Sequence, residues 1–194
     1  MNNMHFIGFY NYTVILTYIS VISAIVGILQ SSQGNFDGAI LCLILSGICD
    51  AFDGMVARTK KNRTEEEKTF GIQIDSLCDV ISFGVFPAIL CFYLGLRGIS
   101  GKILITCYCL CAVVRLAFFN VIEEKRQQVE TGCNKVYRGL PVTSISIILP
   151  FLYLCRNFLS EFVFVGLLHI VIGVTAFLFI LDFKVKKIQL LKGK

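Results

Sequence analysis

Residues 49–79, CDAFDGMVARTKKNRTEEEKTFGIQIDSLCD, place two pairs of aspartates beside some of the most apolar sequence in the chain. Asp50 and Asp53 stand near the start of this segment, and Asp75 and Asp79 stand at its end. A carboxylate inside a membrane span costs about 2.5–3.5 kcal/mol on insertion scales. We therefore expect the four carboxylates to serve a chemical purpose that outweighs this cost.

The composition indicates that the chain lives in a lipid bilayer. Of its 194 residues 56% are hydrophobic and 16% are charged, and its mean hydropathy is +0.75. Six apolar runs approach the ~20 residues that cross a ~30 Å hydrocarbon core; they are 12–29, 37–57, 71–95, 101–122, 140–156 and 161–182. Because lipid offers no hydrogen-bond partners to the backbone, such runs must be helices. The sequence predicts an all-α, polytopic bundle of six transmembrane helices in one domain, residues 1–194.

The distribution of lysine and arginine predicts the orientation of this bundle. Basic residues cluster at 58–68, 125–138 and 184–194, which six crossings would place on one side, whereas the other side has only Arg97, Lys102 and Arg156. Cytoplasmic loops carry the excess of basic residues. We therefore predict a multi-pass protein of the cytoplasmic membrane with both termini and the aspartates on the cytoplasmic side. The net charge of +5 then belongs to a cytoplasmic basic surface that can attract anionic lipid headgroups, although the topology signal alone accounts for most of it. No nucleic-acid partner is expected.

Helical spacing predicts that the four aspartates meet. Residues three or four apart share a helix face, and the two helices are antiparallel, so both pairs approach one pocket. Carboxylate ligands without histidine or cysteine favour hard cations such as Mg²⁺ or Mn²⁺. Four of them suffice for two ions, which clamp the attacking and leaving oxygens of a phosphoryl transfer. The alternative is a set of helix-end charges, with Asp50 and Asp53 paired to Arg58 or Lys60.

The same segment resembles the signature of the CDP-alcohol phosphatidyltransferases, D-x2-D-G-x2-A-R-x8-G-x3-D-x3-D. The matching positions are Asp50, Asp53, Gly54, Ala57, Arg58, Gly71, Asp75 and Asp79. The chain departs from the pattern in having twelve residues, 59–70, where the signature has eight. We expect the four additional residues to lengthen a polar cytoplasmic loop.

The resemblance implies a six-helix enzyme, usually a homodimer, that moves a phosphatidyl group from a CDP-linked lipid to an alcohol and releases CMP. It implies that Asp50, Asp53 and Asp75 bind metal and that Asp79 is a ligand or the general base. The nucleotide-binding residues that it implies are Asp50, Asp53, Gly54, Ala57, Arg58 and Gly71. A guanidinium fork suits a diphosphate, which agrees with the place of Arg58.

The flanking sequence favours serine as the acceptor. Residues 75–88 (DSLCDVISFGVFPA), 115–120 (RLAFFN) and 139–141 (GLP) resemble the membrane phosphatidylserine synthases, which implies CDP-diacylglycerol as donor and L-serine as acceptor. Phe118 stands where that family's pattern has an arginine. Glycerol 3-phosphate, an inositol phosphate or another small alcohol is the alternative acceptor, although phosphorylated acceptors should need more basic residues at the pocket.

Five polar residues outside the signature are candidates for binding the acceptor or the lipid phosphate: Ser82, Arg115, Asn120, Lys135 and Arg138. Arg115 is the strongest, because an arginine within a span normally faces the bundle interior and an anionic partner. Each also has a structural alternative, namely a core hydroxyl for Ser82, an ion pair for Arg115, a helix cap for Asn120 and a solvated basic loop for the last two.

A cation pathway is the non-enzymatic alternative, since carboxylates within spans also mark transporters. Transporters place acids through the depth of the membrane and break helices near its midplane. Here all four acids lie toward one side, which favours the enzyme.

Overall fold

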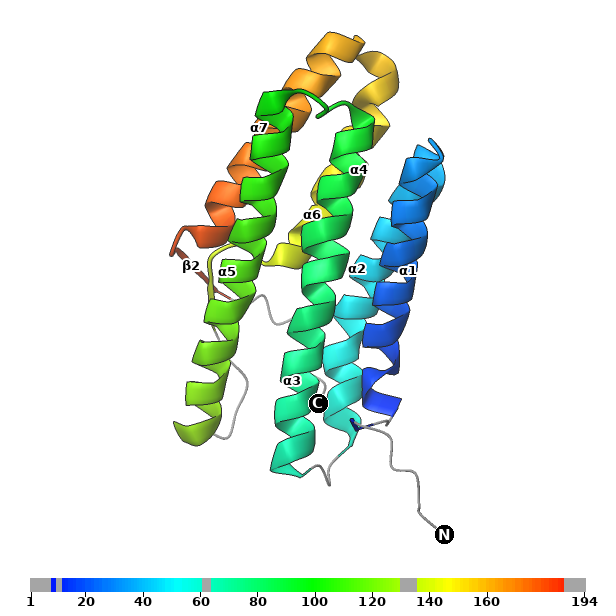
Figure 1. Cartoon of the computed structure of the whole chain (residues 1–194). Helices are drawn as coiled ribbons and strands as arrows, with labels where there is room; N and C mark the ends of the chain where they lie inside the picture. Colours follow the sequence, from blue (N-terminus) through cyan, green and yellow to red (C-terminus); the bar gives the residue numbers. More distant parts are fainter. Residues whose placement is uncertain (1–7, 10–11, 61–63, 130–135, 187–194) are drawn as a thin grey trace.

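The structure, a computed structural model, describes residues 8–9, 12–60, 64–129 and 136–186 as an elongated bundle of helices (Figure 1). The α-helices are α1 (Ile15–Ser32), α2 (Phe36–Thr59), α3 (Glu65–Asp79), α4 (Phe86–Leu94), α5 (Ile99–Val129), α6 (Ile145–Leu154) and α7 (Glu161–Ile180). Two strands, β1 (Val136–Arg138) and β2 (Lys184–Lys186), pair antiparallel, with Tyr137 opposite Val185. The predicted all-α bundle is confirmed, and this small ribbon is added to it.

Five helical segments of the described chain are long and apolar enough to cross a membrane, and a sixth is shorter. The five are Ile15–Ser32, Phe36–Val56, Glu65–Leu94, Ile99–Glu124 and Glu161–Ile180. The sixth, Val142–Phe158, was predicted as a span of ordinary length at 140–156, but its α-helical part has only 10 residues. Tight 3₁₀ turns, Val142–Ser144 and Cys155–Phe158, form its two ends.

The segment predicted as a long polar loop is largely helical. Helix α3 begins at Glu65, where Thr64 and Glu67 form a capping box: the Thr64 hydroxyl accepts from the Glu67 N–H and the Glu67 carboxylate accepts from the Thr64 N–H. Lys60 Nζ also lies 2.8 Å from Glu67 Oε1. A capping box satisfies two N–H groups that a helix start otherwise leaves unpaired. Residues 65–70 therefore belong to α3, and for them the expectation of a lengthened loop is wrong.

Helices α3 and α4 are joined through a π-helical segment, Val80–Val85, that begins directly after Asp79. Pro87 follows it and has no N–H to give to the preceding turn. The carbonyl of Phe83, four residues earlier, instead accepts a 2.6 Å hydrogen bond from the hydroxyl of Tyr108, which is fully buried on α5. Tyr108 therefore ties α5 to the π-helical segment that directly follows Asp79, and π-helical bulges are frequent at functional sites.

Helix α1 packs against its neighbours through small and hydroxyl side chains. Its buried residues are Thr17, Ser20, Ser23, Ala24, Gly27 and Ser31. A Cβ added at Gly27 would clash with the ring of Phe86, which is fully buried at the start of α4. The absence of large side chains on this face lets α1 approach α2 and α4 closely, as small residues do in membrane bundles.

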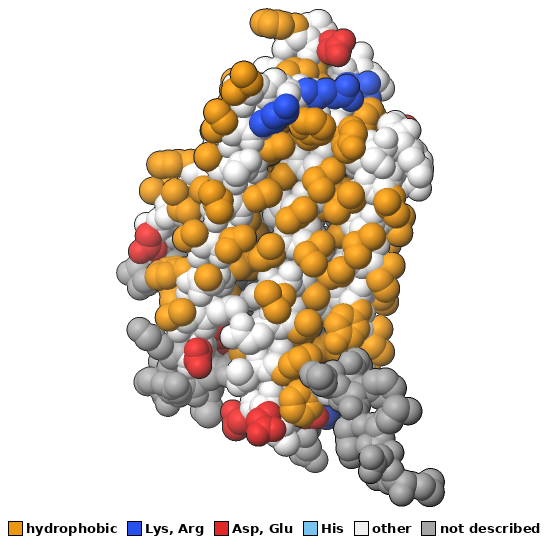
Figure 2. Space-filling view, in the orientation of Figure 1, with side chains coloured by type: hydrophobic (Ala, Val, Ile, Leu, Met, Phe, Trp, Pro, Cys, Tyr) orange, Lys and Arg blue, Asp and Glu red, His pale blue; other side chains and the backbone are white. Residues whose placement is uncertain are grey.

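The outer surface is that of a membrane protein. Figure 2 shows hydrophobic side chains over the middle of the visible face, with lysine and arginine gathered near one end. Large apolar residues are exposed on several helices, among them Ile22 (60%), Leu41 (66%) and Phe151 (71%). Exposed apolar surface of this extent is stable only against lipid or a partner. The chain is thus a multi-pass membrane protein.

Candidate active site

The site is built where the second half of α2 runs antiparallel to α3. Asp50 and Asp53 lie on α2, and Asp75 and Asp79 lie on α3. One carboxylate oxygen from each of Asp50, Asp75 and Asp79 lies within 4.8 Å of the others. Asp53 stands beside this cluster, close enough for its charge to act on Asp50 and Asp75. The structure therefore brings the two predicted pairs together, as helical spacing indicates.

Burial makes this arrangement costly without a cation. Asp53 is 8% exposed and Asp79 is 9% exposed. Two negative charges 4.8 Å apart repel by about 3.5 kcal/mol at an effective dielectric constant of about 20. Among the residues whose side chains are described, none of the four aspartates forms a salt bridge. The cluster therefore requires positive charge from another source.

The donor atoms fit a hard divalent cation. All four side chains offer carboxylate oxygens, which Mg²⁺ and Mn²⁺ prefer. The Oδ1 atom of Asp75 is buried with no hydrogen-bond partner among the described residues, and such an orphaned acceptor is costly unless something binds it. The geometry of the cluster and this free oxygen both favour a metal site.

The structure describes some of the residues that were predicted to bind the nucleotide. Gly54 is exposed on α2, and a Cβ added there would meet nothing within 4 Å. Gly54 lies four residues after Asp50 and therefore shares a face of α2 with it, so a ligand at the acids has room to lie against this part of the helix. Gly71 is half-buried on α3. Ala57 and Arg58 lie in the last turns of α2, and their side chains are outside the described part of the structure.

Arg115 is buried, as predicted, and its hydrogen bond reaches the turn at 139–140. It is 8% exposed, and its Nε donates to the carbonyl oxygen of Leu140 at 3.3 Å. Asp182, just beyond α7, is the acidic residue whose charge acts on it. Gly139, which has a φ of +69°, forms this turn, and its N–H donates a 2.7 Å hydrogen bond to the carbonyl of Phe183. Arg115 thus joins α5 to the 139–140 turn and the segment after α7.

Two other residues that were predicted to bind the acceptor alcohol form hydrogen bonds between helices. The Ser76 hydroxyl donates to Asn120 Oδ1 at 2.6 Å, and Asn120 Nδ2 donates to Gln73 at 3.4 Å, so Asn120 fastens α5 to α3 next to Asp75. Ser82 is fully buried and accepts from the hydroxyl of Ser20 at 3.2 Å. Both side chains serve the packing around the acids in this structure.

The last two candidates are basic residues near β1. Lys135 lies outside the described residues. Arg138 belongs to β1, and its side chain is not described. Their roles stay predictions.

One polar residue at the site was missed by the sequence analysis. The Thr17 hydroxyl on α1 donates to Asp53 Oδ2 at 3.4 Å, and both residues are buried. The available signal was the spacing of hydroxyls along an apolar run, at positions 17, 20 and 23. Residues three apart share a helix face, so this spacing marks the face of α1 that meets the site.

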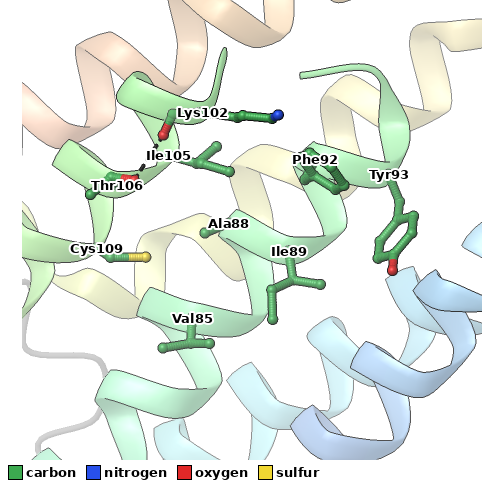
Figure 3. Close-up of a pocket in the computed structure, with 9 residues that line it drawn as sticks. All are labelled: Val85, Ala88, Ile89, Phe92, Tyr93, Lys102, Ile105, Thr106 and Cys109. Atoms are coloured by element: carbon green, nitrogen blue, oxygen red, sulfur yellow. Dashed lines mark hydrogen bonds between the residues drawn. The ribbon is translucent and has the colours of Figure 1, made fainter. Parts of the chain in front are cut away.

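A separate cavity of about 520 Å³ lies between α4 and α5 (Figure 3). Apolar side chains such as Ile89, Phe92 and Ile105 line most of it, and Lys102 stands at one end. The lining contains no carboxylate and begins at Val85, after the acids of α3. This cavity is therefore distinct from the acidic site.

Comparisons with known proteins agree with the chemistry of the cluster. The family model for CDP-alcohol phosphatidyltransferase matches residues 10–184. A CDP-diacylglycerol–serine O-phosphatidyltransferase of Saccharomyces cerevisiae is 37% identical over 117 residues, which are 59% of this chain and 41% of the yeast protein. An archaetidylserine synthase of Methanothermobacter thermautotrophicus is 33% identical over 166 residues, 83% of this chain and 65% of that protein.

A third relative extends the match over more of the chain. The CDP-diacylglycerol–serine O-phosphatidyltransferase of Methanocaldococcus jannaschii is 32% identical over 171 residues, 88% of this chain and 72% of that protein. The chain thus spans from 41% to 72% of the length of these three relatives. No solved structure matches the chain significantly.

Proposed function

Because the chain belongs to the CDP-alcohol phosphatidyltransferase family, we propose that it transfers a phosphatidyl group from CDP-diacylglycerol to L-serine and releases CMP. The observation that carries this proposal is the convergence of Asp50, Asp75 and Asp79 within 4.8 Å of one another, with Asp53 beside them. The choice of serine is supported by the names of the yeast and archaeal relatives.

The proposed cofactors are two divalent ions, Mg²⁺ or Mn²⁺, held by Asp50, Asp53 and Asp75, with Asp79 beside them as a further ligand or as the general base. When bound, such ions neutralise the charge that develops on the diphosphate and activate the attacking alcohol. The donor set and the orphaned oxygen of Asp75 support this assignment.

The protein's own residues then have distinct tasks. Asp79, 9% exposed, accepts the proton of the serine hydroxyl, since a general base must lie within hydrogen-bond reach of that proton. The serine oxygen forms a bond to the phosphorus that carries the lipid, and the bond from that phosphorus to the CMP oxygen breaks. The open surface at Gly54 admits the nucleotide, and Arg58 binds the diphosphate.

The environment of the site is part of the proposal. We place the protein in the cytoplasmic membrane, with the aspartates and both termini on the cytoplasmic side, because the basic residues cluster at 58–68, 125–138 and 184–194. We also propose that residues 1–194 form one transmembrane domain and that two copies form a homodimer, which is the assembly the family resemblance implies.

The experiment is a transfer assay with the purified full chain in mixed micelles. CDP-diacylglycerol, labelled serine and Mg²⁺ or Mn²⁺ should yield labelled phosphatidylserine and an equal amount of CMP, and EDTA should stop both. Glycerol 3-phosphate and an inositol phosphate serve as competing acceptors. Release of CMP only with one of these would refute serine as the acceptor. Metal flux in proteoliposomes without CMP release under any condition would refute the transferase.

A further inference from the structure

Thr17 contributes to the acid cluster from a helix that the signature does not include. The signature lies within residues 50–79 on α2 and α3, whereas Thr17 lies on α1. Its Oγ1 donates to Asp53 Oδ2 at 3.4 Å, across 36 positions of sequence. Thr17 is 5% exposed and Asp53 is 8% exposed, so water does not readily replace this bond.

The packing of α1 on α2 holds the Thr17 hydroxyl in place. Ser46 on α2 donates to the carbonyl of Ser20 at 3.0 Å, one turn from Thr17 along α1. Ser23 on α1 donates to the carbonyl of Cys42 at 2.9 Å, one turn further. One of these bonds is donated from α2 and the other from α1, and together they fix the register of the two helices. The side chain that faces Asp53 is thereby fixed as well.

The chemistry of threonine suits a support for a carboxylate ligand. A β-branched side chain in a helix has few χ1 rotamers, so its hydroxyl is directed with little freedom. Ser31 of the same helix gives its proton to the carbonyl of Gly27 at 2.7 Å, whereas Thr17 gives its proton to a carboxylate on another helix. A donor at Oδ2 limits rotation of the carboxylate, so the direction in which its other oxygen points depends on this bond.

We propose that Thr17 is a positioning residue that orients the Asp53 carboxylate toward the divalent cation. This inference rests on the metal site of the proposed function. Groups that hydrogen-bond to metal ligands typically change metal affinity 10–100-fold when they are removed. Thr17 acts through Asp53 and is not itself a ligand.

The test is direct Mn²⁺ binding to the detergent-purified full chain, with free Mn²⁺ measured by electron paramagnetic resonance. Thr17→Val keeps the shape of the side chain and removes the hydroxyl, and it should weaken Mn²⁺ binding about tenfold. Thr17→Ser keeps the donor and should restore binding to near the wild-type value. Ser23→Ala is the matched control, because it removes a hydroxyl from the same buried face that bonds a carbonyl.

The outcomes separate this inference from the proposed reaction. Equal Mn²⁺ affinity of Thr17→Val and wild type would overturn it, as would an equal loss in Ser23→Ala. Melting temperatures measured with EDTA show how much each variant loses through packing alone. Mn²⁺ binding that depends on Thr17, in a protein that forms no phosphatidylserine, would support the inference and refute serine transfer.

Discussion

Replacing Asp75 by asparagine should stabilise the metal-free protein while removing its response to metal. Asp75 shares the cluster with Asp50 and Asp79, and the three carboxylate oxygens lie within 4.8 Å of one another. Each pair repels by about 3.5 kcal/mol at that separation with an effective dielectric constant of about 20. Asp75→Asn keeps the size of the side chain and removes the charge from two of these pairs.

The full repulsion is an upper limit, because ions and protons from water offset part of it. We take the relieved repulsion as about 2 kcal/mol, roughly half of the repulsion within one pair. A gain of that size in the free energy of unfolding raises the melting temperature of a chain of this length by about 4–8 °C. We expect that increase in EDTA for Asp75→Asn. Mg²⁺ should raise the melting temperature of the wild-type protein and have little effect on this variant, and transfer activity should be lost.

The control is Asp37→Asn, which removes a carboxylate near the other end of α2. Asp37 Oδ1 accepts a 2.8 Å bond from the hydroxyl of Tyr153 and lies in the first turn of the helix. This variant should not gain stability in EDTA and should keep the response to Mg²⁺. A lower melting temperature of Asp75→Asn than of wild type in EDTA would refute the argument from repulsion.

Three further predictions concern the acids, the nucleotide surface and the packing of α1. Asp79→Asn should abolish turnover but retain binding of CDP-diacylglycerol. Asp53→Asn should abolish turnover and also weaken the metal-dependent binding of CDP-diacylglycerol. A binding assay that shows the same loss in both variants would contradict the separate roles. Gly54→Val should raise the KM for CDP-diacylglycerol without lowering the melting temperature, because a Cβ at this position meets nothing within 4 Å and glycine is the weaker helix former. Gly27→Ala should lower the stability by about 1–3 kcal/mol through overpacking against Phe86, and thermal unfolding that matches wild type would contradict this.

Patterns within single segments of the sequence were sufficient to predict most of the helices and the pairing of the aspartates. The lengths of the apolar runs depend only on the chain and the bilayer, so five of the six predicted spans correspond to membrane-length helices. The spacing of Asp50 to Asp53 and of Asp75 to Asp79 decides which residues share a face, because a helix repeats every 3.6 residues. The start of α3 was also readable, since Thr64 and Glu67 have the spacing of a capping box, but the segment was interpreted as a loop.

The hydrogen-bond partners of residues on different helices could not be predicted from the spacing of residues along one helix. Whether Arg115 bonds Leu140 or an acid of the cluster depends on how α5 is rotated against its neighbours. The bond from Tyr108 to Phe83 likewise depends on the depth of α5 beside the π-helical segment between α3 and α4.

The sequence by itself determined that this protein has membrane-spanning helices and that two pairs of acids face one way on adjacent helices. These properties follow from hydrophobic length and helical period, which act within one segment. Only the tertiary structure placed Thr17 beside Asp53 and left Oδ1 of Asp75 without a hydrogen-bond partner among the described residues. Such contacts are set by the rotation and depth of packed helices, which depend on side chains throughout the bundle.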